Sequence, residues 1–161
     1  YGKQSKNNSS LKSRYRLMWM DAVYEPGEVK VVAYNKDGKA VAEKTVRTAG
    51  KPHHIELVSN RNELTADGKD LAYVTVKVVD KDGNLCPTDS RLIHFSVKGA
   101  GKFRAVANGD PTNLEQFHLP KMHAFHGMLT AIVQAGEIAG DLVLTAKASG
   151  VKTGTVHLQA K

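Results

Sequence analysis

Regular alternation of apolar and polar residues over short stretches is the feature that most constrains the fold of this chain. In the stretch 71–79, every second residue from position 72 is alanine or valine. The stretch 28–34 repeats the pattern with Val29, Val31 and Ala33. Successive side chains of a β-strand point to opposite faces of a sheet, so a period of two predicts strands with one buried face.

Turn residues separate these stretches. Asp37 and Gly38 lie between the stretches 28–34 and 39–46, which predicts a β-hairpin because glycine adopts the positive φ that a tight turn needs. Upstream, the stretch 15–20 is predicted as a third strand. The first part of the chain therefore contains too few predicted strands for a closed sandwich.

The segment 47–52 lacks the alternation and contains Gly50 and Pro52. Both residues interrupt regular structure, so this segment is the predicted linker. The sequence thus predicts two domains, residues 1–50 and 51–161.

Short apolar stretches separated by turn residues recur after the linker. They cover 54–58, 71–79, 92–97, 103–107, 128–133, 142–148 and 155–158. About seven such strands are typical of an immunoglobulin-like β-sandwich. The predicted fold class is therefore all-β, with a complete immunoglobulin-like sandwich over 51–161 and a truncated piece of a second such domain over 1–50. The side chains predicted to be inside are Val74, Val76, Val78, Phe95, Val97, Leu144 and Val156.

Several motifs resemble known families. The stretch 64–99, from Leu-Thr-Ala-Asp-Gly to Ile-His-Phe-Ser-Val-Lys-Gly, is similar to bacterial Ig-like domains of the invasin type. The Asn-Gly-Asp-Pro of 108–111, the Glu-Gln-Phe of 115–117 and the Ala-Phe-His-Gly that begins 124–134 resemble the last domain of family 2 β-galactosidases. The stretch 15–34 looks like the closing strands of the preceding domain in that family.

This resemblance implies a non-catalytic C-terminal accessory module of a Bacteroides-like family 2 β-galactosidase. The two catalytic glutamates of that family lie on a TIM barrel, and no position here matches those barrel motifs. The resemblance thus implies no catalytic, cofactor-binding or metal-binding residue in this chain. It also implies a parent enzyme that hydrolyses terminal β-galactosides or related β-glycosides, a periplasmic or extracellular location, and the other domains of the parent as partners.

Residue types that bind metals occur in three places. Asp80, Asp82 and Asn84 begin like a calcium loop, but Arg91 stands where the bidentate glutamate belongs, so a turn is predicted. The histidines 118, 123 and 126 flank Pro120 with a spacing that does not place them on one face, and surface positions are predicted. His53 and His54 are interpreted as residues at the start of a strand.

Other side chains could suggest catalysis or sugar binding. Asp110 and Glu115 are nearby carboxylates, but no cleft-forming barrel accompanies them, so a loop-shaping role is predicted. Cys86 has no basic neighbours that would activate a thiol. A cluster of aromatic residues could stack on sugars, although packing in a sandwich core is the preferred interpretation. These aromatic residues are Tyr15, Trp19, Tyr24 and Tyr34.

Composition and charge argue against several classes of function. The net charge of +7 comes from 23 basic and 16 acidic residues scattered along the chain, so nucleic-acid binding is not expected. No stretch has the roughly 20 apolar residues that span a bilayer. No initiator methionine or signal pattern begins the chain, which indicates a segment of a longer protein.

A carbohydrate-binding module and an adhesin-type surface repeat remain alternatives to the accessory module. Self-association through unprotected strand edges is also expected.

Overall fold

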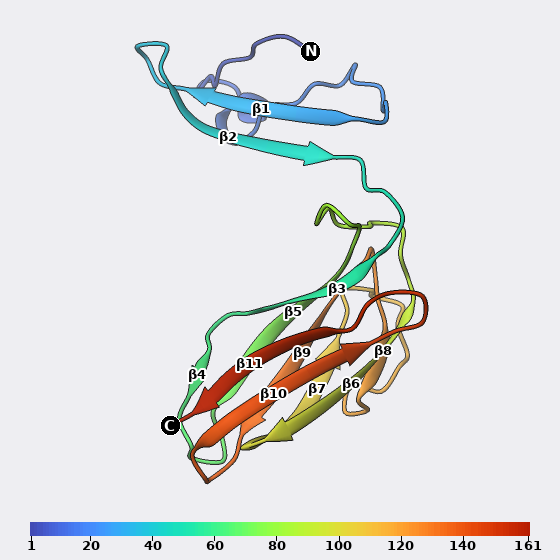
Figure 1. Ribbon diagram of the computed structural model, residues 1–161. Helices are drawn as coiled ribbons and strands as arrows, with labels where there is room; N and C mark the ends of the chain where they lie inside the picture. The colour runs from blue at the N-terminus through green and yellow to red at the C-terminus, as the bar shows by residue number, and fades with distance from the viewer. The chain divides into compact units, whose positions relative to one another are not determined.

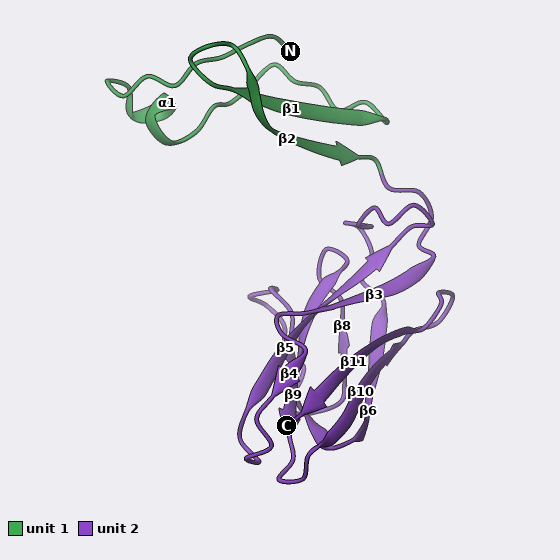
Figure 2. Cartoon of the chain, turned by 60° about the vertical axis from the view of Figure 1, so that its left-hand side comes forward, with its two compact units in different colours: residues 1–48 green, residues 49–161 purple.

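The computed structural model describes residues 1–161, which divide into two units, Tyr1–Thr48 and Ala49–Lys161 (Figure 2). This division falls two residues before the boundary predicted between 50 and 51. Each unit is described separately below. No helix of the structure is both long enough and apolar enough to cross a membrane.

The first unit contains one short helix and one hairpin. Helix α1 (Leu11–Tyr15) precedes the antiparallel strands β1 (Glu28–Tyr34) and β2 (Ala40–Arg47). The turn between the strands forms because the side-chain oxygen of Asn35 accepts hydrogen bonds from the backbone N–H groups of Asp37 and Lys39. The predicted hairpin is therefore confirmed.

The strand predicted at 15–20 is wrong. Tyr15 ends helix α1, and residues 16–20 form no strand. The helix satisfies its backbone locally, with the N–H of Arg14 donating to the carbonyl of Ser10. An extended segment would need a neighbouring strand for its backbone groups, and β1 and β2 pair only with each other.

The two faces of the β1–β2 hairpin differ in chemistry. On one face, the ion pairs Lys30–Glu43 (2.8 Å) and Glu28–Arg47 (2.7 Å) link the strands. The other face is apolar, and its side chains are Val29, Val31, Ala33, Ala42 and Val46, together with Lys44. No residue of 1–48 is buried, so this apolar face is not covered within the unit.

The second unit is a sandwich of two sheets (Figure 1). One sheet has the order β3-β5-β9-β7 and the other β4-β11-β10-β6-β8. The strands are β3 (His54–Ser59), β4 (Glu63–Leu64), β5 (Leu71–Val79), β6 (Leu92–Gly99), β7 (Gly101–Ala107), β8 (Lys121–His123), β9 (Met128–Ala135), β10 (Gly140–Lys147) and β11 (Gly154–Ala160). This arrangement confirms the predicted all-β, immunoglobulin-like class.

The core lies between the two sheets, where the alternating residues predicted it. Five of the seven named side chains are buried, namely Val74, Val76, Val78, Phe95 and Leu144. Val97 and Val156 are partly buried and pack against this core. The prediction missed only β4 and β8, which have two and three residues and are too short to show a period.

Candidate functional site

Asp80 directly follows strand β5 and is the one buried charged residue of the chain, with 2% of its surface exposed. Its Oδ2 accepts hydrogen bonds from the backbone N–H of Gly50 (2.7 Å) and from Nδ2 of Asn84 (3.0 Å). Its Oδ1 accepts from the backbone N–H groups of Asp82 (2.9 Å) and Asn84 (2.8 Å). The protein's own donors thus occupy both carboxylate oxygens.

These bonds give Asp80 a structural role. The Gly50 N–H, followed by the other donors, holds the pKa of the Asp80 carboxyl well below its usual range. A calcium ion would need the same oxygens that Gly50 and Asn84 already engage, and the Asn84 amide directs a donor, not an oxygen, at them. The structure therefore agrees with the predicted turn at 80–84.

Asp110 and Glu115 lie in the long loop between β7 and β8, and each is bound to a different partner. Oδ1 of Asp110 accepts from Oγ1 (2.7 Å) and the backbone N–H (2.8 Å) of Thr112, which lower the pKa of the Asp110 carboxyl. Glu115 binds the backbone N–H and Nδ1 of His123. A general acid needs a raised pKa, so Asp110 is shifted in the wrong direction for that role.

The three histidines of this region do not share a common partner. His123 is hydrogen-bonded to Glu115. Nδ1 of His126 lies 3.2 Å from the carbonyl oxygen of Pro87, and the His126 ring lies against Phe125. His118 is exposed. Elsewhere, His53 and His54 direct their Nδ1 atoms at each other at 3.0 Å, so one ring donates a hydrogen bond to the other.

The aromatic residues of the first unit do not form a core, which corrects the preferred interpretation of their packing. Tyr15 and Tyr24 are about three-quarters exposed, Tyr34 is half exposed, and Trp19 is only partly buried. The physical reason is that residues 1–48 contain one two-stranded sheet and no second layer against which rings could pack. Trp19 donates a hydrogen bond to the carbonyl of Gly2.

Cys86 is buried in the second unit. Burial, with smaller effects from the charges of Asp80 and Asp89, raises the pKa of its thiol. A nucleophilic cysteine needs the opposite shift, because the thiolate is the reactive form. The thiol thus behaves as a core side chain.

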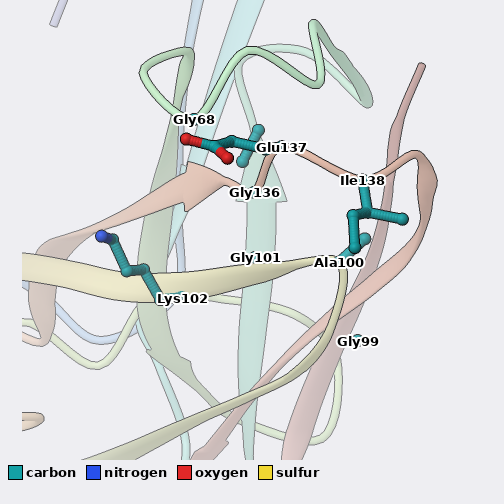
Figure 3. A pocket seen from close by; sticks show the side chains of 9 residues that line it. Gly68, Gly99, Ala100, Gly101, Lys102, Gly136, Glu137 and Ile138 are labelled. Carbon is teal, nitrogen blue, oxygen red and sulfur yellow. The ribbon is translucent and has the colours of Figure 1, made fainter.

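One end of the sandwich has a hollow of about 490 Å³. It is lined by glycine and alanine residues around Gly68, Ala100 and Gly136 and by Ile138, and only Lys102 and Glu137 contribute charged groups (Figure 3). The side chain of Glu137 lies against Gly68. Ligand sites generally combine an apolar wall with several convergent polar groups. This hollow does not have several convergent polar groups.

The outer face of the β3-β5-β9-β7 sheet is more distinctive, because apolar side chains remain exposed there. Val58 is 45% exposed and Tyr73 is 46% exposed, and the strand register places Tyr73 beside Ile132. The row containing Val58 continues with Thr75 and Thr130. We call the residues Val58, Tyr73 and Ile132 the apolar outer face.

A family model decides the relationship of the chain to known proteins. Residues 55–157 match the model described as glycoside hydrolase family 2 C-terminal domain 5. The chain belongs to glycoside hydrolase family 2. Residues 1–42 of this family 2 chain match a second model, described as a domain of unknown function.

Relatives in family 2 include glycosidases of Bacteroides. A β-galactosidase of Bacteroides ovatus named BoGH2A is 44% identical over 138 residues, which are 86% of this chain and 16% of that protein. A β-glucuronidase of Formosa agariphila is 27% identical over 95% of this chain and 16% of that protein. This family 2 chain therefore spans about one-sixth of the curated relatives.

A solved structure of a family 2 glycosyl hydrolase from Bacteroides cellulosilyticus superimposes with a TM-score of 0.80 at 31% identity. The match covers 87% of this chain and 18% of that one. A β-glycosidase from Bacteroides vulgatus superimposes with a TM-score of 0.81 at 27% identity, over 85% of this chain and 18% of that one. The predicted family resemblance is thereby confirmed.

Proposed function

We propose that this chain is a non-catalytic accessory module of a family 2 β-galactosidase, which packs on other domains of the parent enzyme. The apolar outer face carries the proposal. A monomeric protein normally leaves few neighbouring apolar side chains in water, and such patches mark interaction surfaces. The rest of the parent enzyme supplies the partner, since this chain covers one-sixth of its relatives.

The side chains that have acid–base chemistry support a non-catalytic role. Asp110 is held by Thr112, and Glu115 is held by His123. A retaining glycosidase needs two carboxyl groups that face each other across a bound sugar. The β-galactosidase activity of the parent is proposed from the relative that is 44% identical.

Residues 1–50 belong to the same proposal as the C-terminal part of a second Ig-like domain. A two-stranded sheet is only marginally stable alone and must cover its apolar face with another layer. Val29, Val31 and Val46 are 49–63% exposed on the uncovered face of the β1–β2 hairpin. We propose that strands of the parent enzyme cover them.

The periplasmic or extracellular location is proposed from family resemblance alone. Fractionation of the source bacterium, with an antibody against this chain, would test it. Recovery with a cytoplasmic marker enzyme would contradict this part of the proposal.

The full-length enzyme that carries this chain tests the docking role. The double substitution Val58→Glu with Tyr73→Glu places charges on the apolar outer face, so we expect the Tm of the enzyme to fall by roughly 5 °C. The rate per folded active site should stay unchanged. A matched control, Thr155→Glu with Gln159→Glu, alters exposed residues of the other sheet and should leave the Tm unchanged.

Two results would contradict docking through this face. Equal Tm values for both variants would show that no domain packs there. A lost rate with unchanged Tm would show that these residues act in the active site. The same Val58 and Tyr73 substitutions in the isolated chain are expected to leave its unfolding unchanged, because both side chains are already exposed.

A further inference from the structure

Three basic side chains form a row across the outer face of the other sheet. In the strand register, Lys147 of β10 lies directly opposite His94 of β6, and His94 lies directly opposite Lys121 of β8. Residues directly opposite each other project from the same face, and the core residues on both sides of His94 place this face outside. All three side chains are exposed. We call Lys147, His94 and Lys121 the basic row.

The basic row has no acidic partner. The ion pairs of the sandwich use other residues, among them Asp89 with Arg91 just before β6 and Glu115 with His123 on β8. Asp141 projects from the same face at the far end of β10, six positions before Lys147. The charges of Lys147 and Lys121, which lie on either side of His94, therefore remain available to an external anion.

Hydroxyl groups lie beside the basic row. The next row of the same face consists of Ser96, Thr145 and Thr155, which are aligned across β6, β10 and β11. Beyond it, Lys98 and His157 flank Val143. The face thus alternates basic side chains with hydroxyls that donate and accept hydrogen bonds, and none of these side chains is Phe, Tyr or Trp.

We propose that this face binds an anionic polysaccharide, with the carboxylate or sulfate groups of the polymer on Lys147 and Lys121. Neighbouring strands are about 4.8 Å apart, so the row covers about 10 Å and reaches more than one charged group of a chain that crosses the strands. Single-stranded nucleic acids depend on a series of aromatic side chains on which their bases stack, and the only rings on this face are the imidazoles of His94 and His157. The choice of a polysaccharide rests on the proposed glycosidase function.

The experiment measures the affinity of the complete chain for polygalacturonate, which carries carboxylates, and dextran sulfate, which carries sulfate esters. Neutral dextran is the uncharged comparison. The variant Lys121→Gln with Lys147→Gln should weaken binding of at least one anionic polymer about tenfold, because it removes two charge-assisted contacts. The control, Lys69→Gln with Lys81→Gln, removes the same charge from exposed turns and should bind like the unsubstituted chain.

Three outcomes would overturn the proposal. Equal weakening by the two double variants would mean that net charge alone attracts the polymers. Equal affinity for neutral dextran, or equal affinity for single-stranded DNA, would mean that the face does not select anionic sugars. Failure of the docking test at Val58 and Tyr73 concerns the other sheet, so the two proposals can fail separately.

Discussion

The carboxylate of Asp80 accepts a 2.7 Å hydrogen bond from the backbone N–H of Gly50, thirty positions earlier in the chain. This bond fastens the segment that enters the sandwich to the turn after β5. Because Asp80 is buried, loss of the bond would leave polar groups without partners away from water.

Asp80→Asn should therefore destabilise the second unit. The carboxamide can accept through one oxygen only, so the group facing Gly50 N–H or Asn84 would become a donor facing a donor. We expect the Tm to fall on the order of 5 °C, measured by calorimetry. Asp82→Asn is the control, since the Asp82 side chain is exposed, and an equal fall in both variants would refute the role assigned to Asp80.

The low pKa of Asp80 also predicts sensitivity to acid. A carboxyl whose pKa is lower in the folded state stabilises the fold fully above its unfolded pKa, about 3.9, and loses this contribution as the pH falls toward the folded value. The free energy of unfolding should decline below about pH 4, and more gently in Asp80→Asn. Urea unfolding at a series of pH values measures both slopes, and parallel slopes would contradict the prediction.

Gly127 is expected to tolerate no side chain. Its φ is +74°, and an added Cβ would lie 2.3 Å from the carbonyl oxygen of Cys86. Gly127→Ala should lower the free energy of unfolding by about 3 kcal/mol, from backbone strain plus the clash.

Gly83→Ala measures the cost of a positive φ without a steric clash. Gly83 has a φ of +83° but no atom within 4 Å of an added Cβ, so about 1 kcal/mol is expected. Denaturant unfolding compares the two variants. Equal losses would show that the contact with Cys86 does not matter.

The β1–β2 hairpin should exchange its amide hydrogens faster than strands β5 and β9. No side chain of the first unit is buried, whereas β5 and β9 supply the centre of the core. Hydrogen exchange with light scattering measures protection and association together. If residues 28–47 are as protected as β5 in a strictly monomeric sample, the proposal that they form part of a larger domain is wrong.

The sequence predicts the sandwich well because its strands alternate strictly. Val74, Val76 and Val78 could only be buried together if β5 is extended, and they are. The Tyr15–Met20 segment shows the limit of this reasoning. It is rich in apolar and aromatic residues, but a strand also needs a neighbour, and a local pattern does not reveal whether one is available.

The basic row and the apolar outer face could not be predicted for a related reason. Lys121 and Lys147 are 26 positions apart in the sequence, and only the register of β8, β6 and β10 places them on either side of His94. Register depends on bulges and turn geometry as well as on the apolar pattern. The Asp80–Gly50 bond is equally non-local, although the sequence did predict a turn at Asp80.

Incubation of the purified chain with chromogenic β-galactosides, β-glucuronides and β-mannosides tests whether the chain hydrolyses glycosides by itself. We expect rates equal to those of buffer, because Thr112 holds Asp110 and His123 holds Glu115, whereas a retaining glycosidase needs two carboxyl groups that face a bound sugar. The protein should be produced in a host without its own β-galactosidase. Turnover that persists in that material and disappears on Asp110→Asn or Glu115→Gln would contradict a non-catalytic module.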